Sequence, residues 1–171
     1  MKTSLKRHEK AILGMCEVFY HRQYTLLKHR SIHWMIYLLS RKNVSLKPYR
    51  FVWGQDGPVS AELEADLQVL DEKQNDIMDF YDADLTIHAV SATYLASAEC
   101  VREILELEDA SNLFSWVETL ASLSFLAESA VDKTRIIVCN RYMMMKPNAN
   151  YDDVQKAWAV LERAKMGFAE Q

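Results

Sequence analysis

The eight residues from Ile32 to Leu39 read IHWMIYLL, and only His33 and the hydroxyl of Tyr37 interrupt their apolar character. They form the centre of a helix that we predict from about Thr25, a candidate N-cap, to Arg41. Apolar side chains recur nearly all the way round this helix, a pattern typical of a helix buried on most sides. The rest of the chain must therefore supply elements that cover it.

Composition indicates that these covering elements are mostly helices. The 171 residues include only four glycines and three prolines, and half of the residues are apolar. Apolar periodicity predicts further helices over residues 6–23, 61–73, 92–108, 113–128, 132–145 and 152–165, with a short strand at 49–53 and a β-hairpin at 77–90. We expect one mainly α domain that spans residues 1–171.

The order of the elements in residues 1–91 is that of a winged-helix unit, and residues 92–171 would form a helical half. In a winged-helix unit the third helix enters a DNA groove. Here that helix carries five acidic side chains against a single lysine, so phosphates would repel it and DNA binding of the usual kind is not expected. Its acidic residues are instead a solvated surface or a candidate surface for a basic partner: Glu62, Glu64, Asp66, Asp71 and Glu72.

Charge is segregated along the chain. Residues 1–50 carry eleven Lys or Arg against two Glu, a net of +9, so the other 121 residues carry −13 of the total of −4. Such segregation points either to an anionic partner or to mutual neutralisation within the fold. The helix predicted at 25–41 bears a basic stripe that is a candidate contact for a partner protein or a nucleic acid: Lys28, Arg30, His33, Arg41 and Lys42. In the alternative interpretation, these cations meet the acidic segment 62–84.

No catalytic constellation is recognisable. His29 and His33 have the i, i+4 spacing of metal ligands, but no HExxH motif, no carboxylate in that helix and no paired cysteine completes a site. The three cysteines, at 16, 100 and 139, lie in apolar helical patterns without a CxxC pair, so we expect buried free thiols. We therefore predict no metal, no cofactor and no enzyme activity.

The first residues do not read as a targeting segment. The apolar run AILGMCEVFY is broken by Glu17 and is followed by HRQ, with no small-residue cleavage site, and no uncharged run of about 18 apolar residues occurs. Together with the free thiols, this predicts a cytoplasmic protein that does not span a membrane.

The segment FVWGQDGPVS, residues 51–60, concentrates two glycines and a proline. A glycine loop that cradles phosphate is one interpretation, but the segment lacks the GxxxxGK[ST] pattern and any basic residue, and acidic residues follow it. We interpret it as a turn that is a signature of the fold: Gly54 and Gly57 permit the reversal. The next helix starts at an N-cap provided by Ser60 or, alternatively, with Pro58 in its first turn.

Several blocks of the sequence resemble a known family. SIHWMIYLLSRK, FVWGQDGPVS, AELEADLQVLDEK, WVETLASLSFLAES and MMMKPNANYDDVQKAWAVLER follow one another as in the YwgA-like proteins, over residues 26–73 and 113–163. That family is similar in turn to the Panacea, or SocA-like, antitoxin domain. The resemblance implies a helical domain with a winged-helix-like half that binds another macromolecule, and it implies no catalytic residues.

The leading functional hypothesis is therefore a non-enzymatic interaction module that antagonises a toxin or a defence effector in a bacterium or its phage. The alternative is a nucleic-acid-binding regulator that uses the basic N-terminal helices. The sequence leaves self-association open in both cases.

Overall fold

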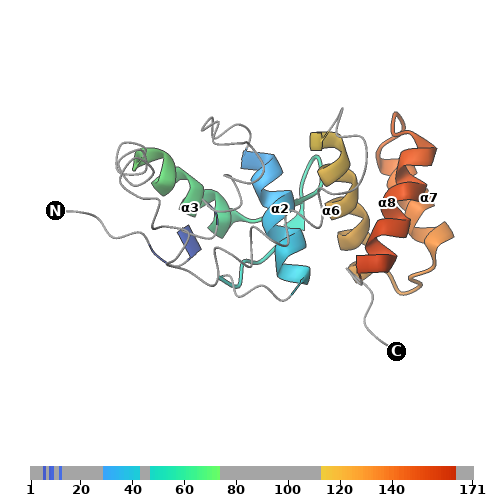
Figure 1. The fold of residues 1–171 in the computed structure, drawn as a ribbon, viewed down its shortest axis with the longest axis horizontal. Coiled ribbons are helices and arrows are strands. Elements are labelled where there is room, and N and C mark those ends of the chain that lie inside the picture. Colours follow the sequence, from blue (N-terminus) through green and yellow to red (C-terminus); the bar gives the residue numbers. More distant parts are fainter. Residues whose placement is uncertain are drawn as a thin grey trace.

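The computed structural model describes residues 6, 8, 9, 12, 29–42, 47–73 and 113–164. These residues form five helices and one small β-hairpin, in the order α2, β1, β2, α3, α6, α7, α8 (Figure 1). The mainly α class with a small hairpin is therefore confirmed. The helix expected at 92–108, the hairpin expected at 77–90 and most of the helix expected at 6–23 lie outside the described residues.

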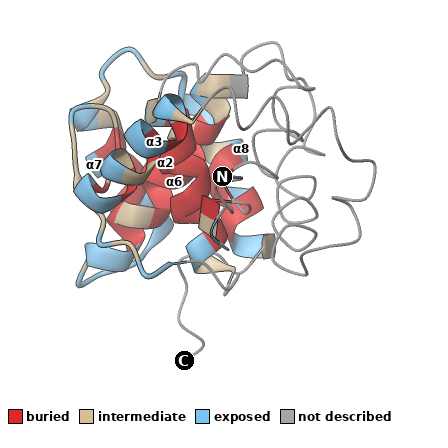
Figure 2. Cartoon of the chain, turned by 90° about the vertical axis from the view of Figure 1, so that its left-hand side faces the viewer, coloured by how far each residue is buried: buried red, intermediate tan, exposed pale blue. Residues whose placement is uncertain are grey.

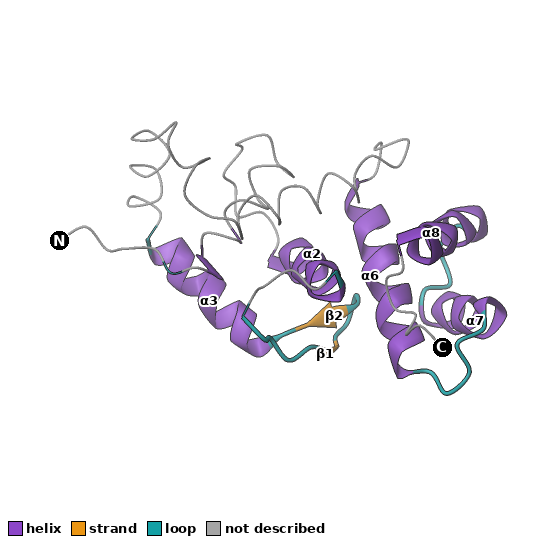
Figure 3. Ribbon diagram, turned by 60° about the horizontal axis from the view of Figure 1, so that its bottom comes forward, coloured by secondary structure: helices purple, strands orange, loops and turns teal. Residues whose placement is uncertain are grey.

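Helix α6, Leu113–Ser129, is the central element of the fold. It contacts α2, His29–Arg41, on one side and both α7, Arg135–Met145, and α8, Tyr151–Ala164, on the other. Helix α3, Ala61–Glu72, packs on α2, so the helices follow one another along the long axis of the molecule (Figures 1 and 3).

The buried helix predicted from IHWMIYLL is observed. All nine residues from Ser31 to Leu39 are buried, and Ile36, Leu38 and Leu39 have no exposed surface. Helix α6 is buried around most of its circumference as well, through Val117, Leu120 and other small or aliphatic residues (Figure 2). The two helices face each other across the centre of one hydrophobic core, to which α3, α7 and α8 add their apolar faces.

The FVWGQDGPVS segment is a turn between two short strands. Strand β1, Val52–Trp53, pairs antiparallel with β2, Pro58–Val59, and the Gly54 N–H donates to the carbonyl of Gly57 at 2.8 Å. Pro58 begins a strand of the two-stranded hairpin, where its missing N–H is tolerated, and so it does not start the helix. The hairpin lies against α2 and α6 (Figure 3).

Local hydrogen bonds set the starts of the helices. Ser60 is the N-cap of α3, because its Oγ accepts from the N–H of Leu63 at 3.4 Å; of the two starts considered from the sequence, this is the correct one. Helix α7 begins three residues later than the expected 132, since the Asp132 carboxylate accepts from the N–H of Thr134 at 2.9 Å and holds a turn. Asn150 caps α8 through the N–H of Asp152 at 2.8 Å.

Candidate functional site

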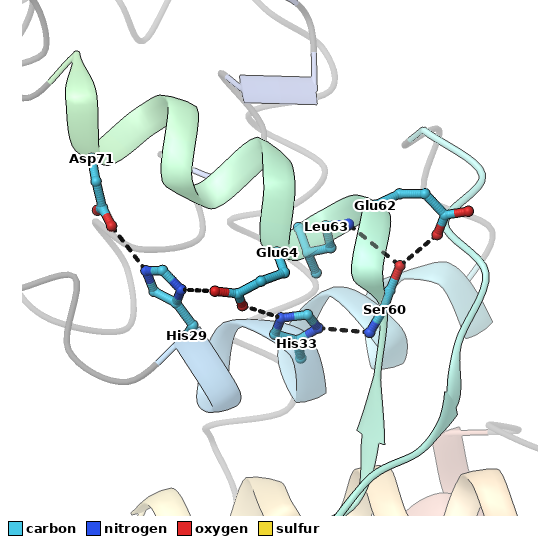
Figure 4. Close-up of polar contacts among 7 residues, drawn as sticks. All are labelled: His29, His33, Ser60, Glu62, Leu63, Glu64 and Asp71. Atoms are coloured by element: carbon cyan, nitrogen blue, oxygen red, sulfur yellow. Dashed lines mark hydrogen bonds and ion pairs between the residues drawn. The ribbon is translucent and has the colours of Figure 1, made fainter.

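The densest polar cluster among the described residues lies between α2 and α3 (Figure 4). The Glu64 carboxylate joins two histidines one helical turn apart: its Oε1 lies 2.7 Å from His29 Nδ1 and its Oε2 lies 3.1 Å from His33 Nε2. The other nitrogen of His29 lies 3.0 Å from Asp71 Oδ2, and that of His33 accepts from the N–H of Ser60 at 2.9 Å. We call these five residues the histidine network.

The contacts of His33 fix its tautomer. A backbone N–H can only donate, so the bond from Ser60 requires an unprotonated Nδ1, and Nε2 must then carry the hydrogen that it donates to Glu64. Burial lowers the pKa of His33 and outweighs the opposite effect of Glu64, which keeps this ring neutral.

His29 is in the opposite state. Both of its nitrogens contact carboxylates, which are acceptors, so both carry hydrogens and the ring is an imidazolium. Burial alone would lower the pKa of His29, but the hydrogen bonds and charges of Glu64 and Asp71 outweigh it and raise the pKa. The same contacts lower the pKa of Glu64. Two histidines on one helix face thus hold different charges around one carboxylate.

This geometry does not suit a metal ion, in spite of the i, i+4 spacing. Neutral His33 has no free lone pair, since Nδ1 accepts from Ser60 and Nε2 carries the hydrogen. Within the described part of the chain, no group of three ligating side chains is placed to hold a metal ion. The network is instead a polar connection between α2, α3 and the end of the hairpin.

The predicted basic stripe is largely engaged inside the fold. Arg30 forms an ion pair with Asp56 in the hairpin turn, and Arg41 donates to Glu128 at 2.9 Å. Tyr37, on the same helix, is buried and also donates to Glu128, at 2.9 Å. Lys42 follows the end of α2 and is half-buried, and Lys28 lies outside the described residues.

His33 does not belong to an exposed stripe. Only 3% of its surface is exposed, because it faces α3 and the hairpin from the buried side of α2. The neighbouring Trp34 is buried as well. In this fold other parts of the chain cover His33 and Trp34, so the two side chains do not form an exposed surface.

The acidic residues of α3 are likewise paired within the chain. Asp66 accepts from Lys47 and from the hydroxyl of Tyr49, both at 2.8 Å. Glu62 accepts from Ser60 Oγ at 2.8 Å and from the N–H of Arg50 at 3.2 Å, contacts that hold the first turn of the helix.

Of the five acidic residues predicted as a partner surface, Glu64 and Asp71 belong to the histidine network, and Glu72 is exposed at the helix end. Within the described residues, three of the eleven cations of residues 1–50 pair with carboxylates of the acidic part of the chain, as the neutralisation alternative predicts: Arg30, Arg41 and Lys47.

A second ionic cluster, centred on Lys146, joins segments that are far apart in the sequence and was not predicted from it. Lys146, just after α7, donates to Asp56 at 2.9 Å and lies 2.8 Å from Glu118 of α6. Its carboxylate partners outweigh the effect of burial and raise the pKa of Lys146, while Lys146 in turn lowers the pKa of Asp56. Since Asp56 also pairs with Arg30, the hairpin turn connects α2 with the end of α7.

Helix α7 exposes large apolar side chains. Its buried side is formed by Val138, Cys139 and Tyr142, and burial raises the pKa of the Cys139 thiol. On its outer side, Ile136 is 72% exposed and Met144 is 82% exposed, with Ile137 and Met145 beside them at 45% and 40%. We call these four outer residues the α7 apolar face. Of the three consecutive methionines at the end of α7, Met143 packs on the core, and Met144 and Met145 are exposed.

Comparison of the chain with family models, with curated proteins and with solved structures found no match. The resemblance to the YwgA-like proteins therefore stays a prediction. None of the described helices is long and apolar enough to cross a membrane.

Proposed function

We propose that this chain is a non-enzymatic interaction module that binds another protein, in the manner of an antitoxin that holds a toxin or a defence effector inactive. The observation that carries the proposal is the α7 apolar face. Folded proteins that act alone rarely expose a group of large aliphatic side chains, and such groups mark protein interfaces. The order of sequence blocks shared with the YwgA-like proteins supports the same conclusion, and we propose with it the winged-helix-like arrangement of residues 1–91.

The state of the cationic residues favours a protein partner over a nucleic acid. Arg30 and Arg41, which would have to neutralise phosphates, already have carboxylate partners in Asp56 and Glu128. Phosphate binding would have to replace these ion pairs and would bring the polyanion near the two carboxylates. The histidine network likewise uses its side chains for contacts between helices.

Affinity purification of the tagged full chain from cells that encode it tests the proposal. We expect one protein in near-stoichiometric amount, and the two purified proteins should form a complex again when mixed. Recovery of the chain alone, from cells that also express the neighbouring genes, would overturn the proposal.

A nucleic-acid retention assay tests the alternative function, that of a nucleic-acid-binding regulator. Wild type is compared with Arg30→Glu/Arg41→Glu over a range of salt concentrations, and we expect weak retention that the substitutions leave unchanged. Tight retention that falls steeply with salt and is lost in the double variant would establish the alternative instead.

A further inference from the structure

We infer that the α7 apolar face is the docking surface for an amphipathic helix of the partner protein, and that this helix carries acidic residues beside its apolar stripe. The inference rests on the proposed function and names the surface and the chemistry of the partner. Three properties of α7 support it: the spacing of its exposed side chains, its charge, and its position at one end of the molecule.

The exposed side chains form two parallel rows. Ile136, Asn140 and Met144 are spaced four residues apart, and Ile137, Arg141 and Met145 repeat the spacing one residue further on. Rows at i, i+4 spacing form the ridges that pack into the grooves of a second helix. The rows span eight residues, about 12 Å along the axis at 1.5 Å per residue, which is long enough for two turns of a partner helix. Methionine at one end lets the surface adapt to the partner.

The charge of α7 selects an acidic partner. The helix carries Arg135 and Arg141 and no acidic residue, and the charges of Asp132 and Lys133 just before it offset each other. Arg141 is exposed, lies midway along the rows, and forms no ion pair with any described residue. Arg135 donates to the side-chain oxygen of Gln155 in α8. Because that amide is neutral, the hydrogen bond does not neutralise the charge of Arg135. A carboxylate on the partner would thus meet an available cation between two apolar pairs.

The same charge argues against a second copy of the chain as the occupant. In a twofold pairing of α7 with α7, the midpoint of the face meets itself, so the two Arg141 side chains would oppose each other. A membrane surface fits less well than a protein helix, because the exposed face has four apolar residues and no aromatic anchor.

Among the described residues, the outer side of α7 is open to such a partner, with Ile136 and Met144 72% and 82% exposed. Helix α7 lies at the end of the molecule opposite α3, and its other side packs on α6 and α8 (Figures 1 and 3). A partner helix bound to α7 would add one more helix at this end of the row of packed helices.

Two synthetic peptides provide a defined probe. Both are amphipathic helices with the same leucine stripe; one carries glutamates beside the stripe and the other carries lysines. We expect the acidic peptide to bind the full-length protein at least tenfold more tightly than the basic one. Met144→Glu should abolish this binding and Arg141→Glu should reverse the preference, whereas Val69→Glu, at an exposed valine of α3, should bind like wild type. Equal binding of both peptides, or loss only in the α3 variant, would overturn the inference.

Photo-crosslinking in the intact cell extends the test to the natural partner. A benzophenone residue at position 144 should cross-link to a partner segment that contains Asp or Glu among apolar residues, and the same residue at position 69 should not. Cross-links from 144 only to a second copy, or binding to anionic lipid vesicles that Met144→Glu abolishes, would refute a protein-helix site. If a partner copurifies but cross-links only from 69, the proposed function stands and the docking surface is wrong.

Discussion

Replacement of Gly57 by alanine gives the sharpest test of the fold. Gly57 has φ of 132°, a backbone conformation that residues with a Cβ atom rarely adopt. Holding a residue other than glycine in such a conformation costs about 1–3 kcal/mol. This backbone cost applies whatever space surrounds the side chain.

The space around Gly57 is also filled. A Cβ atom there would lie 2.8 Å from Ser122 Oγ and 3.0 Å from Trp34 Nε1, both closer than an ordinary contact. Both side chains are buried in the seam between α2, α6 and the hairpin, so neither can simply turn into solvent. Overpacking of this kind costs roughly 1–3 kcal/mol. Together with the backbone cost we expect a loss of about 2–6 kcal/mol.

Urea unfolding followed by circular dichroism measures the loss, and a thermal scan should show a fall in Tm of about 2–4 °C per kcal/mol. Ser122→Ala removes the closest atom, so the double variant should recover part of the loss, and the remainder reports the backbone conformation together with the contact to Trp34. Gln55→Ala, at an exposed position of the same turn, is the matched control. A Gly57→Ala loss below about 1 kcal/mol would show that residue 57 is neither strained nor tightly enclosed, because it is less than either cost alone predicts.

Three further predictions concern ionisable groups. His29 has a raised pKa, so its contribution to stability is present below about pH 6.5 and is lost as the pH rises through the folded-state value; the deficit of His29→Gln should be largest in acid. His33 has a lowered pKa and resists protonation in the fold, so the deficit of His33→Asn should narrow as the pH falls below about 6.5; parallel unfolding curves for the two variants would contradict both assignments. The buried Cys139 thiol, whose pKa is raised, should react with a thiol reagent only after unfolding, and rapid labelling that Cys139→Ser removes would show that the site opens in the native state.

The sequence was sufficient to predict the helices that the structure describes. Apolar periodicity placed α2, α3, α6 and α8 to within a few residues, because each helix buries one face or nearly its whole surface. Periodicity placed the start of α7 three residues too early. There the Asp132 carboxylate accepts a hydrogen bond from the N–H of Thr134, and this bond holds a turn in place of the first helical residues. Periodicity also missed β2, since a proline before an acidic helix resembles a helix start.

The polar contacts were harder to predict because they depend on tertiary placement. The i, i+4 pair of His29 and His33 was visible in the sequence. Whether His33 could bind a metal ion depended on the hydrogen bond from the N–H of Ser60, which is 27 residues away from His33. Asp56 and Lys146 are 90 residues apart, and nothing local in either segment indicates the other. The α7 apolar face was visible only as a run of methionines, and the structure was needed to show which of them point outward.

The pairing of α2 with α6 has a consequence for synthesis of the protein. Seventy-one residues lie between Arg41 and Leu113, so the ribosome completes the buried helix α2 long before α6, the helix that covers it. At about 5–20 residues per second, α2 waits several seconds for its partner. During that time the part of α2 that α6 covers lacks its native contact and is available to chaperones or to other nascent chains, and a messenger truncated before residue 113 would produce a fragment that lacks α6.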